Sequence, residues 1–387
     1  MDTKVIKKDN KIKVCKRCVM DTTAKNISFD ENGICNYCTS YFENIDKVLK
    51  NEEQLKPIIS KIKFEGRNKK YDCIIGVSGG VDSTYVAYLV KKLGLRPLAV
   101  HLDNGWDSEL AVSNIEKTLK KLDIDLYTHV INWNEFKDLQ LSFLKASIPG
   151  MEIPSDHAIF AVLNKVALKN GIRYIVNGSN FKMEYIMDPD WSEFIGQMDW
   201  LLIKNIHKQF GKIPLQTFPR MTRWNVYYTK FIKKHTVINV LDYIDFSKEK
   251  GMKIIQDDLG WVYYGGKHYE SIYTRFTQAY IQPTKFNIDK RKAHFSNVIC
   301  MGEMNRDEAL LKLAQDPYHS EEMKNDDLEY FKKKMNFSDQ DFEIMMDCPI
   351  KSFKHYQGYF NHPLYSKLNK FALNLHFKLK KLGFYGK

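Results

Sequence analysis

Residues 71–83 read YDCIIGVSGGVDS, an apolar run followed directly by a loop of small and polar residues. The run Tyr71–Val77 has the length and the β-branched content of a buried strand. The loop Ser78–Ser83 contains two glycines, and an amphipathic helical pattern with Val86 on its inner face follows it and stops at Gly94. This succession of strand, glycine loop and helix predicts one unit of a parallel sheet.

The same alternation continues along the chain to about residue 176. Further strands are expected at 96–102, 124–130 and 172–176, and helices at 108–122, 133–146 and 156–170. Strands that alternate with helices predict an α/β fold with a doubly wound parallel sheet. Ligands of such sheets bind at the carboxyl ends of the strands, where Ser78–Ser83, Asp103–Asn104 and Asn177–Asn180 are expected.

The loop SGGVDS has the composition of an anion-binding loop. Gly79 and Gly80 let backbone amides approach an anion closely, and Ser78 and Ser83 add hydroxyl donors. A carboxylate such as Asp82 repels phosphate, so its best use is to hold Mg²⁺ that bridges phosphate oxygens. The loop lacks the lysine of a Walker A motif and the GxGxxG of dinucleotide folds. The alternative is an ordinary capped Gly-Gly turn.

Four of the seven cysteines form the pattern C-x2-C-x16-C-x2-C, and they are Cys15, Cys18, Cys35 and Cys38. Two such knuckles provide four thiolates for a closed, tetrahedral structural Zn²⁺ site. An iron–sulfur cluster is the alternative, whereas disulfides conflict with the cytoplasmic location predicted from an N-terminus without an apolar leader. The other three cysteines, Cys73, Cys300 and Cys348, have no partner at ligand spacing and are expected to be core residues.

The composition narrows the class of protein. The chain of 387 residues is 44% hydrophobic and 13% aromatic, which excludes disorder as its main state, and no apolar run is long enough to cross a membrane. Its formal net charge is +12, and the segment 351–387 contributes eight lysines and nine aromatics without any acidic residue. Such a tail can contact nucleic acid, a membrane surface or an acidic partner. A solvated helix whose aromatics pack on the body is the alternative.

The Ser-Gly-Gly-x-Asp-Ser loop resembles the PP-loop of the ATP pyrophosphatases, such as NAD, GMP and asparagine synthetases and tRNA-modifying enzymes. The resemblance implies cleavage of ATP between its α- and β-phosphates, transfer of AMP to a substrate oxygen and a loop that binds the departing pyrophosphate. The residues implied to bind ATP are Ser78, Gly79, Gly80, Val81, Asp82, Ser83, Asp103 and Gly178. In ammonia-using NAD synthetases, a glycine after a later strand is followed six positions on by a glutamate that shares Mg²⁺ with the loop aspartate. Gly178 corresponds to that glycine. Glu184 has that spacing, and a surface glutamate is the alternative.

Motifs between Cys15 and Cys348 resemble more narrowly the N-acetyl sugar amidotransferases, the WbpG-like and PseA-like proteins of O-antigen and pseudaminic or legionaminic acid pathways. They include CKRC, FDENGICNYC, LDNGWDSELAV, NGSN, LGWVYYGGKHYESIYTRFTQAY and FNIDKRKAHFSNVICMGEMNRDEAL. This resemblance implies an enzyme that adenylates the acetamido oxygen of a nucleotide-activated N-acetyl sugar and replaces it with ammonia-derived nitrogen. It also implies ammonia from a HisH-like glutaminase with a HisF-like barrel subunit, because no glutaminase motif is visible in this chain. Free ammonia is the alternative source.

Two clusters of basic residues in the later motifs are candidates for the site. We expect Lys267 and Arg275, with Lys290 or Arg291, to contact phosphates or the acidic groups of the sugar nucleotide. His268 is a candidate for proton transfer, as is His294, although a solvated or structural role is the alternative for each of these residues.

These assignments divide the chain into five regions. They are a zinc-binding region with a linker helix (1–66), a PP-loop domain (67–180), a substrate-binding insertion (181–245), a helical region that completes the site (246–350) and a basic aromatic tail (351–387). A rival class is the tRNA thiolases, some of which join cysteine knuckles to a PP-loop and hold tRNA with basic surfaces. Those enzymes typically need catalytic cysteines in the PP-loop domain. Here that domain has only Cys73, so no nucleic-acid partner is expected.

Overall fold

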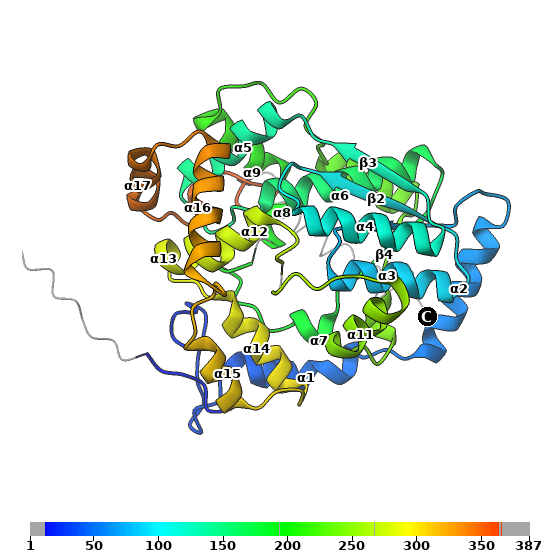
Figure 1. Cartoon of the computed structure of the whole chain (residues 1–387), viewed down its shortest axis with the longest axis horizontal. Coiled ribbons are helices and arrows are strands. Elements are labelled where there is room, and N and C mark those ends of the chain that lie inside the picture. The colour runs from blue at the N-terminus through cyan, green and yellow to red at the C-terminus, as the bar shows by residue number, and fades with distance from the viewer. Residues whose placement is uncertain (1–11, 193, 267, 364, 366–387) are drawn as a thin grey trace, which may run out of the picture.

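The computed structural model describes residues 12–192, 194–266, 268–363 and 365. Its core is a sheet of five parallel strands in the order β3-β2-β1-β4-β5 (Figure 1). The strands are β1 (Cys73–Gly76), β2 (Pro97–Asp103), β3 (Leu126–Val130), β4 (Tyr174–Asn177) and β5 (Thr236–Asn239). The chain winds outward from β1 in both directions, which confirms the predicted doubly wound α/β fold. Such a strand order opens a ligand crevice beside β1, where the direction of winding reverses.

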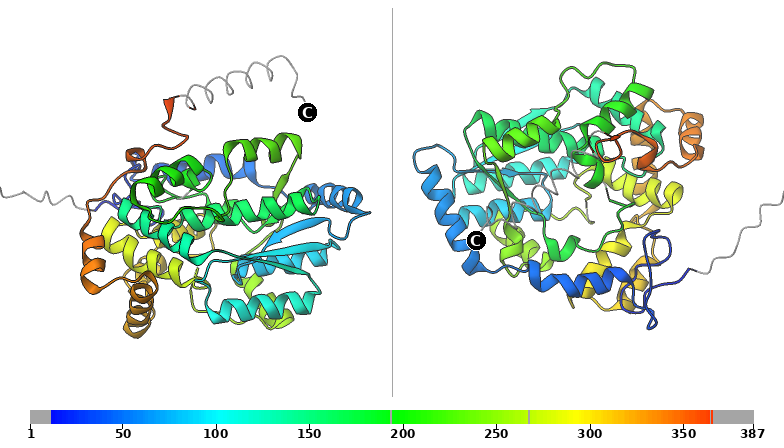
Figure 2. Two further views of the ribbon diagram at one scale, coloured as in Figure 1. Left: turned by 90° about the horizontal axis from the view of Figure 1, so that it is seen from above. Right: turned by 180° about the vertical axis from the view of Figure 1, so that it is seen from behind.

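Helices cover both faces of the sheet because alternate strand residues point to opposite sides. Ile74 packs with side chains of one helical layer, and its neighbour Ile75 packs with the other. The first layer contains α5 (Trp133–Ala146), α6 (Ile153–Lys169) and α9 (Trp200–Phe210), and the second contains α2 (Glu52–Gly66), α3 (Val81–Lys92) and α4 (Glu109–Leu122). In the left view of Figure 2 the cyan helix α4 and the green helices lie on opposite sides of the sheet.

The segment between β4 and α11 differs from the predicted insertion. It forms α7 (Phe181–Glu184), α8 (Phe194–Gln197), α9, α10 (Arg223–Tyr227), the π-helix η1 (Tyr228–Ile232), β5 and the 3-10 helix η2 (Val240–Tyr243). β5 pairs in parallel with β4, so residues placed in the insertion 181–245 belong to the core sheet. The strand is only four residues long and half-exposed, which gives its sequence no strong strand pattern.

The N-terminal region also contains two helices where a single linker helix was predicted. α1 (Asn36–Val48) ends before Asn51, whose side chain accepts a hydrogen bond from the backbone amide of Gln54 (3.0 Å). The Gln54 side chain in turn accepts a hydrogen bond from the Asn51 amide. This pair completes a capping box and starts α2 as a new helix.

The C-terminal region begins with α11 (Lys248–Leu259), which packs beside α3, and the helices after it lie beyond the carboxyl ends of the strands (Figure 1). These later helices are α12 (Ile272–Phe276), the π-helix η3 (Thr277–Ile281), α13 (Gln282–Phe286), α14 (Lys290–Cys300), α15 (Arg306–Leu313), α16 (Glu321–Met335), α17 (Asp339–Asp347) and the 3-10 helix η4 (Phe353–His355). The amide of Ile272 donates to the Trp106 carbonyl, and the amide of Ser108 donates to the Glu270 carbonyl (both 2.9 Å). These bonds fasten the start of the C-terminal region to the loop after β2. No helix in the described ranges is long and apolar enough to cross a membrane.

Candidate active site and cysteine centre

The loop Ser78–Ser83 joins β1 to α3 at the carboxyl edge of the sheet. Gly79 has a φ of +78°, and a Cβ at this position would lie 2.5 Å from the Ala111 carbonyl oxygen, so only glycine fits. The Ser83 hydroxyl accepts a hydrogen bond from the Ser78 amide and lies 3.2 Å from the Ser78 hydroxyl. The loop is therefore held by its own hydroxyl groups in a fixed shape.

The loop also forms the beginning of α3, where helix amides lack partners within the helix. Gly80 is the N-cap residue, and it supplies no side chain that could bond these amides. The Val81 amide lies 3.3 Å from the Tyr264 hydroxyl oxygen, and Trp261 donates its indole N–H to the Gly79 carbonyl (2.9 Å). This arrangement is suited to an anion at the helix N-terminus, and the C-terminal region closes one side of it.

A carboxylate that sequence reasoning did not select, Glu270, lies against this loop. Its Oε1 would lie 3.1 Å from a Cβ placed on Gly80. Its Oε2, like Oδ1 of Asp82, is buried and has no hydrogen-bond partner among the described residues. Two buried carboxylate oxygens without donors, beside an anion-binding loop, match the oxygen ligands that Mg²⁺ takes in phosphate sites. The two oxygens are thus of the chemical type that would hold Mg²⁺.

Two neighbours keep Glu270 ionised. Burial raises the pKa of Glu270, but His268 and the Tyr264 hydroxyl outweigh burial and leave the pKa below its usual value. The His268 Nδ1 lies 3.6 Å from Oε1 of Glu270, and His268 adopts a left-handed φ of +63°. Burial and the nearby Glu270 carboxylate raise the pKa of Tyr264, so its hydroxyl keeps the proton.

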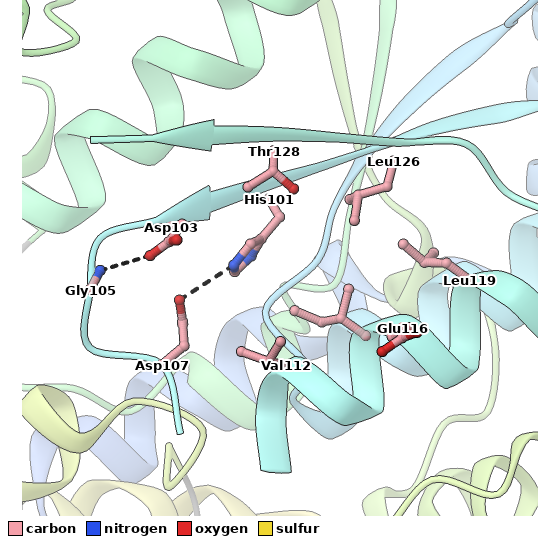
Figure 3. Close-up of a pocket in the computed structure, with 10 residues that line it drawn as sticks. His101, Asp103, Gly105, Asp107, Val112, Glu116, Leu119, Leu126 and Thr128 are labelled. Atoms are coloured by element: carbon pink, nitrogen blue, oxygen red, sulfur yellow. Dashed lines mark hydrogen bonds and ion pairs between the residues drawn. The ribbon is translucent and has the colours of Figure 1, made fainter. Parts of the chain in front are cut away.

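A pocket of about 460 Å³ opens between α4 and the ends of β2 and β3 (Figure 3). One side of it is apolar and comes largely from α4, with Val112, Ile115 and Leu119. The other side is polar and contains His101 and Asp107. The volume lies in the range of small-molecule sites, and an apolar wall facing a few polar groups suits a planar heterocycle with polar substituents.

The polar side of the pocket is fixed by His101. Its Nδ1 lies 3.0 Å from the Val77 carbonyl oxygen, at the beginning of the loop, and its Nε2 lies 3.3 Å from Oδ2 of Asp107. Burial lowers the pKa of His101, but Asp107 and the carbonyl outweigh burial and raise it above its usual value. The imidazole thus connects the loop to the pocket. Its two partners favour the protonated form of the ring.

Two predicted ATP ligands from other strands lie at this edge. Asp103 lines the pocket and accepts a hydrogen bond from the Gly105 amide (3.0 Å), which shapes the turn after β2. A Cβ at Gly178 would lie 3.3 Å from the Asp82 backbone, so this glycine permits the approach of the loop after β4. Glu184 lies at the exposed end of α7, and its role as a Mg²⁺ ligand stays a prediction.

The predicted cationic residues have protein partners. Arg275 forms a bidentate ion pair with Asp327, with both N–O distances 2.6 Å. Arg291 pairs with Asp289 (2.8 Å) and donates to the Gln315 carbonyl (2.9 Å). In this structure both guanidinium groups hold the C-terminal helices together, and contacts to phosphate stay predictions.

Three further candidates belong to these clusters. Lys290 is buried in α14. The His294 ring lies 6.3 Å from the His268 ring, measured between centroids. Lys267 lies outside the described residues.

The four knuckle cysteines converge on one point, as their spacing predicted. All four are fully buried, and their sulfur atoms lie within 4.8 Å of one another. The Sγ atoms of Cys18 and Cys35 are 3.7 Å apart, close to the ~3.8 Å expected for two thiolates bound tetrahedrally to one Zn²⁺. The Cys35 amide lies 3.2 Å from the sulfur of Cys15, which favours a thiolate there. The geometry fits a closed four-thiolate metal centre.

Contacts with α14 and α15 dock the cysteine centre on the C-terminal region. Lys292 forms an ion pair with Asp21 (2.6 Å), and Arg306 donates to the carbonyls of Cys15 and Cys18 (both 3.1 Å).

One expectation about the other cysteines is wrong. Cys300 is only half-buried, and its sulfur lies 3.9 Å from the sulfur of Cys38. Because the two residues are 262 positions apart, no local spacing could reveal this fifth thiol. Cys348 is also only half-buried, whereas Cys73 is buried in β1 as expected.

Comparison with known proteins finds a family match in the C-terminal region. Residues 270–370 match the model described as "LPS biosynthesis protein WbpG-like, C-terminal domain". The match begins at Glu270, the carboxylate that lies against the loop. The chain therefore carries a WbpG-like C-terminal domain together with the PP-loop, which confirms the resemblance inferred from the motifs.

Three relatives cover parts of the chain. An uncharacterised protein of Methanocaldococcus jannaschii is 29% identical over 42% of this chain and 58% of its own length. The tRNA-5-methyluridine(54) 2-sulfurtransferase of Thermotoga maritima is 24% identical over 51% of this chain and 64% of its own length. The glutamine-hydrolysing GMP synthase of Pyrobaculum aerophilum is 40% identical over 21% of this chain and 16% of its own length. The chain thus spans less than two thirds of each of these relatives.

Proposed function

We propose that this protein is an ATP-dependent amidotransferase that converts the acetamido group of a nucleotide-activated N-acetyl sugar into an acetamidino group for a surface polysaccharide. One observation carries the proposal: the WbpG-like region begins at Glu270, and this residue reaches the PP-loop at Gly80. The family-specific region and the ATP-binding loop therefore contribute to the same site.

The chain's own groups suit binding and activation of ATP. The pocket beside His101 would hold the adenosine, and backbone amides in the first turn of α3 would bind phosphate oxygens. Asp82 and Glu270 would hold Mg²⁺, which when bound supplies positive charge next to the departing pyrophosphate. A site that binds ATP and the sugar together would also remove the entropic cost of their encounter.

The reaction follows from the weakness of an amide as an electrophile. The acetamido oxygen would attack the α-phosphorus, break the bond to the bridging oxygen and release pyrophosphate. The resulting imidate carries AMP as its leaving group, and ammonia would add to its carbon. Loss of AMP and of one proton then gives the amidine. Solvent or a second ammonia would receive that proton, because Glu270 is assigned to Mg²⁺ and its lowered pKa makes it a weak base.

Mass spectrometry tests the reaction directly. UDP- and CMP-linked diacetamido sugars are incubated with the protein, ATP, Mg²⁺ and ammonium. The expected product has oxygen replaced by NH and appears with equimolar AMP and pyrophosphate. Pyrophosphate release without any change in the sugars would contradict the proposed substrate class.

We also propose that a separate glutaminase with a barrel subunit supplies the ammonia, because no nucleophile elbow of a glutaminase occurs in the sequence. The protein is assayed with glutamine alone and with the candidate subunits. Turnover with glutamine by the single chain would contradict this partner.

We propose zinc for the cysteine centre, because four thiolates without an open position form a structural Zn²⁺ site. Metal analysis of the purified protein is expected to find one zinc per chain. Iron with a visible absorption band would indicate a cluster.

A tRNA-modifying activity is the second candidate, favoured by the similarity to the Thermotoga maritima sulfurtransferase. Between residues 67 and 180 the sole cysteine is Cys73, and burial raises the pKa of its thiol well above the usual value. Such a thiol is a poor sulfur carrier. Thiolated nucleosides in tRNA incubated with the protein, ATP and a sulfur donor would favour this candidate instead.

A further inference from the structure

Two segments without acidic residues account for the whole positive charge of the chain. Residues 200–241 contain eight lysines and arginines, and residues 351–387 contain eight lysines. The other 43 basic residues are outnumbered by the 47 acidic ones. A chance distribution of 47 acidic residues would not leave both segments empty, so the charge is concentrated in these places.

The two segments meet in the structure. The Arg223 guanidinium lies 5.2 Å from the ring centroids of both Tyr359 and Tyr365. The Asn205 side chain donates to the Gln357 carbonyl (2.8 Å). The chain continues after Tyr365 with residues 366–387, which lie outside the described structure and whose sequence contains six more lysines. The described start of the tail thus lies against the segment 200–241.

Large apolar side chains are exposed on this surface. α10 and η1 present Trp224, Phe231 and Ile232, which are 71%, 56% and 59% exposed. Tyr227 connects them, because its ring lies 5.5 Å from Trp224 and 5.0 Å from Phe231. Residues three or four apart share one side of a helix, so these aromatics form a continuous stripe.

Cations flank the stripe without being neutralised. Lys230, Lys233 and Lys234 are exposed, and within the described residues none of them forms a salt bridge. The nearest aromatic rings lie 5.6 Å or more from the lysine nitrogens. Their charge is therefore available to a partner.

We propose that this surface, made of α10, η1 and the start of the tail, binds an anionic membrane surface. Lysines attract acidic headgroups, while Trp, Tyr and Phe side chains enter the boundary between headgroups and acyl chains. Exposed Ile232 favours lipid over RNA, because an aliphatic side chain neither stacks on a base nor binds a phosphate. Figure 2 places this green segment on the side of the sheet opposite α4, so binding would leave the pocket accessible.

Vesicle binding by the full chain tests the proposal. The protein is sedimented with vesicles of phosphatidylcholine alone or containing about a third phosphatidylglycerol, at low and high salt. Binding is expected to the anionic vesicles and to weaken with salt. Trp224 is the most exposed tryptophan described, so anionic vesicles are expected to shift the fluorescence to the blue in wild type and much less in Trp224→Phe.

Paired variants separate charge from apolar contact. Lys230→Glu/Lys233→Glu is expected to weaken binding at least tenfold, since each lysine near the surface contributes ~1 kcal/mol. Phe231→Ser/Ile232→Ser is expected to weaken vesicle binding. The binding that remains should be abolished by high salt, because only electrostatic attraction is left. The matched control is Lys117→Glu/Lys121→Glu on α4, whose two lysines are also exposed, and its binding should weaken only slightly, through the loss of net charge.

Three results would overturn the proposal. They are equal binding to neutral and anionic vesicles, no binding to either, and equal losses in the control and the α10–η1 variants. A parallel titration with purified tRNA serves as the competing arm. Tight tRNA binding that Lys230→Glu/Lys233→Glu abolishes, without vesicle binding, would identify a nucleic-acid surface instead. The outcome does not depend on which reaction the enzyme performs.

Discussion

The PP-loop edge and the cysteine centre are both built from buried anionic groups, yet they are completed in opposite ways. At the loop, Asp82 and Glu270 each keep one buried oxygen without a donor. At the cysteine centre, backbone amides lie close to the sulfur atoms, and the four thiols face one another. An incomplete site can exchange ligands in every catalytic cycle, whereas a closed site resists exchange and stabilises the fold.

Asp82→Asn is expected to give the largest difference between an effect on activity and an effect on stability. The amide keeps the shape of the side chain but removes the charge that would hold Mg²⁺, so pyrophosphate release should fall by about a thousandfold. The unfolding temperature should not fall, because a buried carboxylate without a donor costs stability. Pyrophosphate assays and calorimetry are compared with Asp257→Asn on the exposed side of α11, which should match wild type in both. Retained activity in Asp82→Asn would contradict the metal assignment.

The opposite pattern is expected from Cys18→Ser. Loss of one ligand weakens the metal centre, and the apolar cluster around it loses its support. We expect the zinc content to drop and the free energy of unfolding to fall by about 3 kcal/mol or more. Cys348→Ser, which changes a half-buried thiol away from the centre, serves as the control. Unchanged zinc content and stability in Cys18→Ser would show that the centre is not a closed structural site.

An intermediate effect is expected from Glu270→Gln, which tests whether the WbpG-like region takes part in the incomplete site. Activity should fall about 10- to 100-fold, with weaker Mg²⁺ or Mn²⁺ binding in calorimetry, and the fold should be unaffected. Glu303→Gln, in the same region but not at the loop, controls for loss of charge. A metal affinity equal to that of wild type would leave Glu270 outside the metal site.

Sequence reasoning found the parts of both regions that depend on local pattern. The strand, glycine loop and helix at 71–94 and the spacing of the knuckle cysteines follow from periodicity and short-range chemistry, and the structure contains both. It did not find Glu270 at the loop or Cys300 beside Cys38, because each contact joins positions roughly two hundred or more residues apart. The prediction that Arg275 contacts phosphate did not foresee its ion pair with Asp327, because Asp327 lies on a different helix. Long-range pairing of charges is invisible to patterns read along the chain.

The smallest effect expected is a pH dependence located at the polar side of the pocket. Because Asp107 holds the folded-state pKa of His101 above its ordinary value of 6.5, the pair stabilises the fold fully below that pH. This contribution is lost as the pH rises through the raised pKa. Asp107→Asn should therefore lower stability by roughly 1 kcal/mol at about pH 6 and by less at about pH 8. Asp257→Asn on the exposed side of α11 controls for the loss of one carboxylate charge. ATP titrations at both pH values then show whether the pair also acts on the nucleotide. If Asp107→Asn shifts stability equally at both pH values, His101 does not titrate with the pair, and the loop and the pocket are not linked through its protonation.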